Sequence, residues 1–195
     1  MPLIVSPTQS RGDNAASSVA SINTSATGLA LSETSSSRLR TIEVTGSATV
    51  VSVTDGTNLC YGSLKLFDFP EGALVSFGGV MSVTAFATAT NLAGLASATS
   101  GQVFVALGSV AAANDNDLTS TEADIIPKTS TGALTSGATT ATFRNTTQAS
   151  VAAFAGQATA TACYLNIGAS IDGTSSGTIA VTFTAKITYL YLGDN

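Results

Sequence analysis

The sequence predicts an all-β protein: a jelly-roll-like β-sandwich with an extended N-terminal arm. Three observations support this fold class. Runs of β-branched and aromatic residues alternate with polar ones along residues 41–195, and turn-forming residues separate the runs. No segment has a helical period of comparable strength. The length of 195 residues suits one domain whose core needs no disulfide or metal to hold it together.

Residues 1–40 differ in composition from the rest of the chain. Isolated apolar residues stand among Ser, Thr and Ala without a sustained period. Such a segment cannot bury enough surface by itself to offset the entropy of ordering it. We therefore expect an extended arm over residues 1–40, leaning on its own domain or on a neighbouring chain, and a β-sandwich domain over residues 41–195.

The first strands of the domain follow directly. Residues 41–56 contain β-branched residues in near-alternation and end in Asp55-Gly56, a pair that favours a turn. Residues 62–68 predict the next strand. It ends near Pro70, which cannot donate to a ladder, and Gly72, which permits a positive φ.

The middle of the chain has strands of different clarity. Residues 73–89 predict a long strand with a bulge or bend at Gly78-Gly79. Residues 101–109 are almost wholly apolar, as in a strand at the centre of a sheet. Residues 111–140 read as a long connection, and residues 141–161 are ambiguous between a strand and an Ala-rich helical turn.

The last strand gives the clearest pattern. Residues 163–172 predict a strand, a loop follows at residues 173–177, and residues 178–193 then alternate with period two, as in a half-buried antiparallel strand. One face of this last strand carries Ile179, Val181, Phe183, Ala185, Ile187, Tyr189 and Tyr191.

The end of this strand predicts a subunit interface. Tyr189 and Tyr191 lie on one face, while Leu190 and Leu192 lie on the other. A strand end that is apolar on both faces needs cover on both sides, and one core supplies only one. We therefore expect the C-terminal end to lie near a subunit interface, with Tyr189 and Tyr191 as contacts.

Composition and charge limit the partners. Charged residues make up only 10% of the chain, and the net charge is −5. A low-charge surface rich in hydroxyls favours association with other proteins, whereas nucleic acid and anionic membranes attract clustered Lys and Arg. We expect no nucleic-acid and no membrane partner. The first residues lack the features of a secretion signal, so we expect synthesis in the cytoplasm.

The residues of common catalytic and metal sites are missing from the sequence. It contains no His, which removes the Ser-His-Asp and Cys-His arrangements and imidazole ligands. Two distant cysteines cannot form a structural zinc site, and the Gly-rich stretches lie within predicted strands, away from any helix that could hold phosphate. We expect no enzymatic activity and no cofactor.

Four acidic residues and the two cysteines raise the questions of ion binding and of a disulfide. Asp115, Asp117, Glu122 and Asp124 are close enough in sequence to hold calcium, but their spacing does not fit an EF-hand. A solvated loop with Asx turns is favoured, and ion binding stays open. Cys60 and Cys163 lie in apolar strand contexts, which favours two reduced, buried thiols over a disulfide.

An adhesive tripeptide lies in the arm. Arg11-Gly12-Asp13 spells a motif that binds cell-surface receptors when a rigid loop presents it. Its neighbours are typical of a flexible or extended arm. We therefore expect the tripeptide to be part of a docking arm that binds no animal receptor.

Three stretches resemble small virion proteins of tailed bacteriophages, namely the capsid decoration or cement proteins. They are FDFPEGALVSFGGVMSVTAF, VFVALGSVAAANDNDLTSTEADIIP and LNIGASIDGTSSGTIAVTFTAKITYLYLG. The resemblance lies in pattern and order over most of residues 41–195. It implies a jelly-roll-like homotrimer on the outer surface of a phage head, bridging neighbouring copies of the major capsid protein. It carries no residue-by-residue site with it.

The sequence also suggests how such a protein would attach. The arm can add backbone hydrogen bonds to a strand edge or lie on the capsid, with contacts expected from Leu29, Leu31, Arg38 and Arg40. A phage head-fibre, tail-surface or host-binding adhesive module is the alternative. A hydrolase that uses acidic residues is a third and weaker hypothesis.

Overall fold

The fold is all-β, as the sequence predicts. The computed structural model describes residues 20–36, 38–56, 59–88, 103–113, 118–130, 141–144, 152–157, 161–169 and 177–193. Within these ranges the strands form one 11-stranded antiparallel sheet, and the helical structure is limited to a single 3-10 turn, η1 (Ser120–Glu122).

The strands run along the whole described chain. Their bounds are β1 (Ser21–Ile22), β2 (Leu29–Ser36), β3 (Leu39–Gly56), β4 (Leu59–Asp68), β5 (Gly72–Thr88), β6 (Val103–Gly108), β7 (Ile126–Ser130), β8 (Ala141–Arg144), β9 (Ala152–Gln157), β10 (Ala162–Ala169) and β11 (Gly177–Gly193). The order in the sheet is β7-β6-β10-β4-β3-β11-β5-β8, with β1 on β4, β2 on β3 and β9 on β5.

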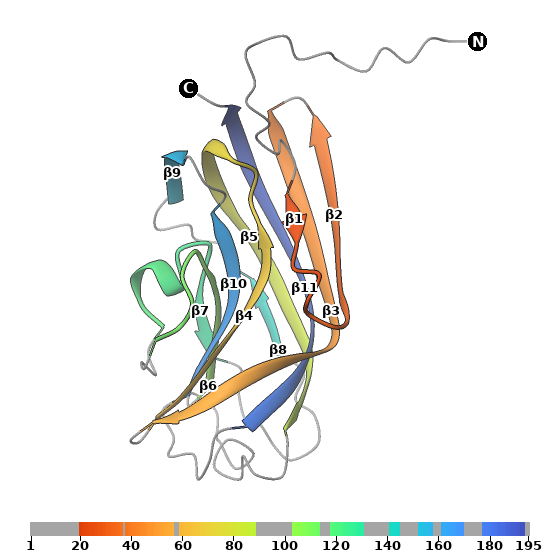
Figure 1. Ribbon diagram of the computed structural model, residues 1–195, viewed down its shortest axis with the longest axis vertical. Helices are drawn as coiled ribbons and strands as arrows, with labels where there is room; N and C mark the ends of the chain where they lie inside the picture. The colour runs from red at the N-terminus through yellow and green to blue at the C-terminus, as the bar shows by residue number, and fades with distance from the viewer. Residues whose placement is uncertain are drawn as a thin grey trace, which may run out of the picture.

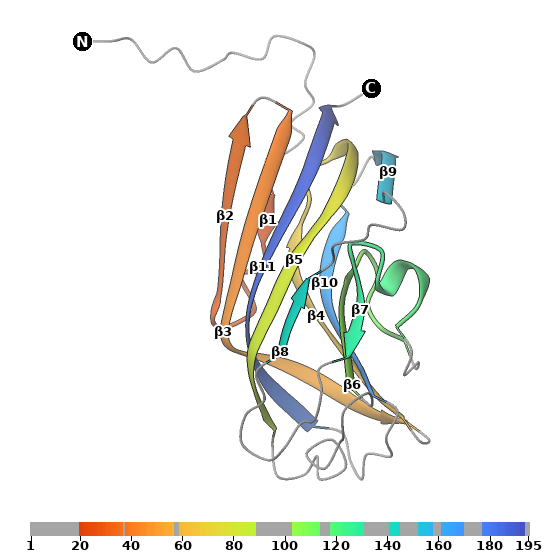
Figure 2. The same ribbon diagram turned by 180° about the vertical axis from the view of Figure 1, so that it is seen from behind.

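The sheet curls into a half-barrel because β3 takes part in two wings. One edge of β3 pairs with β11 from Leu39 to Val53, while the other edge pairs first with β2 and then, from Ser52 to Gly56, with β4. Figures 1 and 2 show β4 and β10 on one side of the core and β11 and β5 on the other. The strands thus form one continuous sheet, where the sequence predicts the two separate sheets of a sandwich.

The core between the wings follows the predicted alternation. On β11 every odd-numbered residue from Ile179 to Tyr191 is buried, while Thr184 and Lys186 on the other face are exposed. Buried side chains of β3, β4, β5, β6 and β10 complete one hydrophobic cluster, which includes Ile42, Val44, Leu66, Phe67, Met81, Val83, Val105, Leu107, Leu165 and Ile167.

Two irregularities bend the long strands. In β3 the register against β11 shifts beside Ala48, whose φ of 48° is a left-handed conformation. In β5 the register against β11 shifts between Gly79 and Ser76, which confirms the irregularity predicted at Gly78-Gly79. Such bulges increase local twist and let a long strand curve around a core.

Part of the predicted arm belongs to the sheet. All of β2 pairs antiparallel with β3, from Leu29 opposite Gly46 to Ser36 opposite Leu39. Strand β1 pairs with β4 through Ser21 and Ile22. Residues 20–36 are therefore structural members of the β-domain, while residues 1–19, including the Arg11-Gly12-Asp13 tripeptide, lie outside the described residues.

The ambiguous middle of the chain contains more strand than the sequence indicates. The predicted connection 111–140 includes η1 and β7, and residues 141–161 contain β8 and β9. The predicted loop 173–177 lies outside the described residues except for its last position, where β11 begins.

Both cysteines are buried and neither forms a disulfide, as the sequence predicts. Cys60 pairs with Ala169 and Cys163 with Phe67, at opposite ends of the β4–β10 ladder. Six residues of β4 lie between these pairs and separate the thiols by roughly 20 Å, which is too far for a disulfide.

Candidate interaction surface

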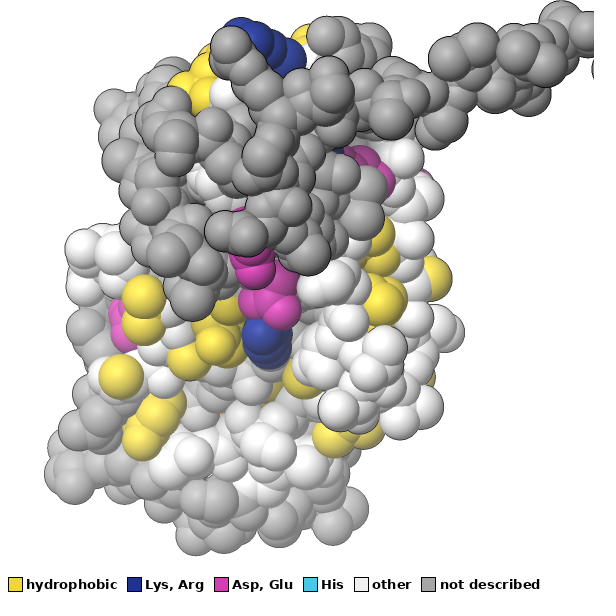
Figure 3. All heavy atoms as spheres, turned by 45° about the horizontal axis from the view of Figure 1, so that its top comes forward, with side chains coloured by type: hydrophobic (Ala, Val, Ile, Leu, Met, Phe, Trp, Pro, Cys, Tyr) yellow, Lys and Arg dark blue, Asp and Glu magenta, His cyan; other side chains and the backbone are white. Residues whose placement is uncertain are grey.

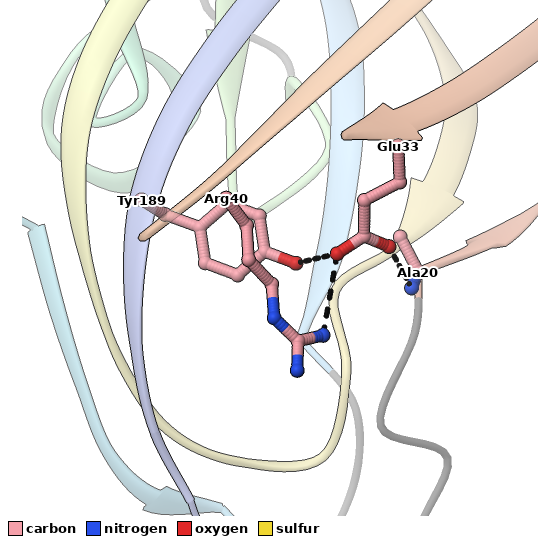
Figure 4. Close-up of polar contacts among 4 residues, drawn as sticks. All are labelled: Ala20, Glu33, Arg40 and Tyr189. Carbon is pink, nitrogen blue, oxygen red and sulfur yellow. Dashed lines mark hydrogen bonds and ion pairs between the residues drawn. The ribbon is translucent and has the colours of Figure 1, made fainter. Parts of the chain in front are cut away.

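A polar network joins the start of the described chain to one end of the half-barrel (Figure 4). Glu33 on β2 is its centre. Its Oε1 accepts hydrogen bonds from the Tyr189 hydroxyl at 2.6 Å and from Arg40 Nη1 at 3.2 Å, and its Oε2 accepts one from the Ala20 backbone N–H at 2.9 Å. We call this end, where β2 ends and β3 begins, the upper end.

The network compensates charges that are removed from water. The side chains of Arg40 and Glu33 are only 10% and 11% exposed. The Arg40 guanidinium also lies 4.4 Å from the centre of the Tyr191 ring, a cation–π contact. Burial, and then the hydrogen bond and charge of Glu33, raise the pKa of Tyr189 well above its ordinary value. The phenol therefore stays a hydrogen-bond donor at any physiological pH.

Three of the four residues expected to contact a capsid face inward. Leu29 and Leu31 are partly buried and pack against the core. Arg40 is 9% exposed and is held by Glu33. Arg38, in the turn between β2 and β3, is exposed. The structure thus leaves Arg38 as the one member of this set that is open to a partner.

The two tyrosines predicted at a subunit interface are also internal. Tyr189 is fully buried and Tyr191 is 8% exposed. The Tyr189 ring packs edge-on against Phe69, with their centroids 5.4 Å apart. An interface at this end of β11 would therefore be made by the opposite side chains, Leu190 and Leu192.

The outer face of β3, β11 and β5 is the side of these strands that points away from the core (Figure 2). Cross-strand rows of hydroxyls cover much of it. Thr41 and Thr188 are 3.3 Å apart through their hydroxyl oxygens, and Thr45, Thr184 and Ser82 form the next hydroxyl row. Between these rows, Lys186 and Glu43 form an exposed ion pair at 3.3 Å.

Large apolar side chains gather at the upper end of this outer face. Leu39, Leu190 and Val75 are directly opposite one another on β3, β11 and β5, and so they point to the same side. The patch consists of Leu39, Val75, Phe77, Val80, Leu190 and Leu192, which we call the outer patch. Leu39, Phe77, Val80 and Leu192 are 46%, 44%, 45% and 46% exposed.

The front of the molecule has a different character. Among its described residues, single charged side chains stand between polar and apolar ones (Figure 3). Lys65 and Asp68 on β4 form an ion pair at 2.8 Å that is partly exposed. On this view the described surface forms no broad band of one charge, as the low content of charged residues predicts.

The described carboxylates of the acidic stretch, which the sequence suggests as a possible calcium site, stabilise the fold through hydrogen bonds. Asp124 accepts hydrogen bonds from the backbone N–H and the hydroxyl of Ser109, at 2.8 and 2.7 Å. Glu122 accepts from the backbone N–H groups of Ala113 and Thr119. Asp115 and Asp117 lie outside the described residues, and the described ones contain no group of three acidic or thiol ligands that could hold a metal.

A buried amide holds the loop that follows β6. Asn166 on β10 is fully buried and donates from Nδ2 to the carbonyls of Val110 and Glu122, both at 2.8 Å. Its Oδ1 accepts from the Ala112 N–H at 3.1 Å. Both polar atoms of this side chain thus hold backbone groups of the loop, which gives Asn166 a structural role.

Glu33, which links three segments at the upper end, is not among the site residues predicted from the sequence. The signal was present in the alternation of Leu29, Leu31 and Glu33 with small residues, which is typical of a strand with one buried face. The many Ser and Thr residues around it concealed this pattern.

Within the described ranges no helix is long and apolar enough to cross a membrane. No protein-family model, curated protein or solved structure matches the chain.

Proposed function

We propose that this chain is a structural virion protein that decorates the outer surface of a bacteriophage head and cements neighbouring major capsid proteins. The jelly-roll-like assignment and the homotrimer belong to the same proposal. It starts from the resemblance of the three stretches to capsid decoration proteins, and it needs a surface suited to lasting protein contacts.

The outer face of β3, β11 and β5 is the observation that supports the proposal best. It combines uncharged hydroxyl rows with the exposed outer patch, and contiguous apolar side chains on a surface are typical of protein interaction sites. A face of this kind loses little on desolvation, because few charges have to be removed from water.

The shape of the sheet also favours the proposal. Two wings around one core resemble the two layers of a jelly roll, although one continuous sheet joins them. Long antiparallel strands give a rigid body that can hold two neighbours at a fixed separation. Arg38, exposed at the upper end, is the charged contact that the proposal assigns to the capsid protein.

The deciding experiment measures copies per particle. Virions produced from the genome that encodes this chain are purified, and peptides of this chain and of the major capsid protein are quantified by mass spectrometry. The proposal expects a ratio near a simple fraction of the capsid protein, and density for this chain on the outside of the head. A few copies per particle would favour a head fibre, tail-surface or host-binding module, and absence from virions would reject both.

A second measurement addresses the cementing role. Heads that lack this chain are compared with complete heads while temperature rises, and DNA release is followed with an intercalating dye. The proposal expects release at a lower temperature without the chain, and restoration when purified protein is added back. Equal release temperatures would contradict the cementing role and support decoration of the head alone.

A further inference from the structure

The outer patch needs an occupant in the free protein. Its six apolar side chains lie on the outer face of three adjacent strands, and four of them are close to half exposed. Apolar side chains that are contiguous on a surface favour association, unless some part of the protein covers them.

The chain itself offers a segment of matching chemistry. Residues 2–5 read Pro-Leu-Ile-Val, the longest apolar run before Ala20 apart from the initial Met. Leu, Ile and Val match the aliphatic side chains of the outer patch, and β-branched residues favour the extended backbone that lies flat on a sheet. Pro2 and Pro7 limit the conformations of this run, which lowers the entropic cost of fixing it.

The geometry of the described residues brings this segment within reach. Ala20 is fixed to Glu33 at the upper end, the same end at which the outer patch lies. Glu33 pairs with Ile42, three residues from Leu39 on the same strand, and its side chain points to the core, whereas the outer patch lies on the opposite face of the sheet. The segment therefore has to pass over the upper edge of the sheet and cover roughly 10 Å along β3 and roughly 10 Å across the strands on the outer side. Sixteen residues separate Ile4 from Ala20 and span about 20 Å as a flexible coil, or roughly 50 Å when extended.

Tethering favours the chain's own segment over that of a second copy. A flexible linker whose average length matches the distance to its site gives an effective concentration on the order of millimolar. At micromolar protein, the identical segment of a copy that is not already associated is present at a far lower concentration. We propose that residues 2–5 dock on the outer patch of the same chain and cover it in the free protein.

This inference does not depend on the virion assignment. It assigns an occupant to a surface, and it holds or fails for the isolated protein whatever particle that protein joins.

A disulfide-trapping experiment on the full-length chain tests it. Ile4→Cys is combined with Leu192→Cys in the outer patch, or with Val50→Cys as the matched control. Val50 is 51% exposed on the same outer face at its far end, against 46% for Leu192. The native cysteines are buried, and peptide mapping identifies the bond that forms. We expect an intramolecular disulfide that forms at least about tenfold faster with Leu192→Cys than with Val50→Cys, because the docked segment holds Ile4 near the patch.

A second pair of changes separates docking from mere proximity. Leu3→Ser and Val5→Ser, added to the Ile4→Cys and Leu192→Cys protein, keep the tether length and remove apolar contacts. We expect trapping to slow by about tenfold or more, since two buried aliphatic side chains are lost. Equal rates of disulfide formation at positions 192 and 50, or a rate that does not change when the two serines are introduced, would overturn the proposal. Disulfide-linked dimers as the main product would overturn it in favour of a second copy.

Discussion

Glu33 is the residue on which the upper end of the molecule depends. One carboxylate receives a phenol, a guanidinium and a backbone N–H from three different segments. These partners come from β3, β11 and the residue preceding β1, so the contact closes the β2 edge against the rest of the sheet. A charge that is nearly removed from water and fully partnered costs much more to disrupt than an exposed one.

Glu33→Gln should destabilise the protein by about 3 kcal/mol, because it removes the negative charge from an ion pair with Arg40 that is nearly removed from water. The matched control is Glu43→Gln, which breaks the exposed ion pair to Lys186 and should cost less than about 1 kcal/mol. Urea unfolding monitored by tyrosine fluorescence or circular dichroism measures both. Equal losses for the two variants would show that burial adds nothing to the Glu33 network.

Asp124 is a second carboxylate that the fold partly buries, and its burial affects its titration. Burial raises the pKa of Asp124 above its ordinary value of 3.8, although the hydrogen bonds from Ser109 act in the other direction. The native state therefore holds this proton more tightly than the unfolded chain does. The resulting contribution to stability is complete below the ordinary value and is lost as pH rises through the raised pKa.

Asp124→Asn should remove this pH dependence. The amide does not ionise, so the free energy of unfolding of the wild type should fall relative to that of the variant as pH rises from about 4. The measurement is chemical unfolding of both proteins at several pH values up to 7. A difference between them that does not change with pH would show that Asp124 titrates alike in the folded and unfolded states.

At the scale of elements, β2 shows that the folded domain begins before residue 41. It pairs along its full length with β3 and places two leucines and Glu33 against the core. Its removal would strip one side of β3, leaving a long edge strand with free backbone groups, which is a hazard for aggregation.

Deletion of residues 1–19 should lower the free energy of unfolding by only about 1–2 kcal/mol, the contribution expected from the docked residues 2–5, since this change leaves β1, β2 and the core in place. Deletion of residues 1–36 should cost several kcal/mol, a large part of the roughly 5–15 kcal/mol that stabilises a domain. Denaturant unfolding and sedimentation compare the two. A compact, equally stable protein after the longer deletion would show that β2 is dispensable.

The alternation of buried and exposed residues within single strands can be predicted from the sequence. The way in which the strands assemble into one sheet cannot. The pattern from Ile179 to Tyr191 predicts both the strand and its buried face, which the structure confirms. The same pattern already places Tyr189 and Tyr191 on that buried face, and their apolar rings fill it. Leu190 and Leu192, opposite them, are the more exposed pair.

Some features depend on contacts between distant segments. That β3 serves both wings follows from its curvature and from pairing with partners on both sides, neither of which has a local pattern. Glu33, Arg40 and Tyr189 meet only because β2, β3 and β11 are adjacent in register. Strand β7 was hidden in a stretch rich in Thr and Ser, where propensity is weak and tertiary pairing decides.

At the scale of the whole molecule, association is the first expectation to measure. The proposal predicts that sedimentation of the isolated protein gives three times the 19.3 kDa of one chain. The low surface charge offers little repulsion between copies, which favours a stable assembly. A single species of monomer mass at micromolar concentration would speak against the homotrimer.

Arg38 provides a test of attachment that leaves the fold intact. Arg38→Glu reverses an exposed charge, and exposed charges at the rim of an interface mainly change the rate of association. We expect about tenfold slower binding to heads that lack this chain, with an effect that shrinks as salt rises. Lys65→Glu, on β4 in the other wing and away from the outer face, serves as the control. An equal effect of both changes would indicate general charge repulsion without a contact at Arg38.

The long β3–β11 ladder has a mechanical consequence. These strands stay paired from Gly177 to Leu190 and run from one end of the described sheet to the other (Figure 1). Tension applied along them loads the hydrogen bonds sideways and together, so many must break at the same moment. Tension applied across the wings would instead peel the strands apart one bond at a time. The direction in which the protein is fastened therefore decides how much force it withstands.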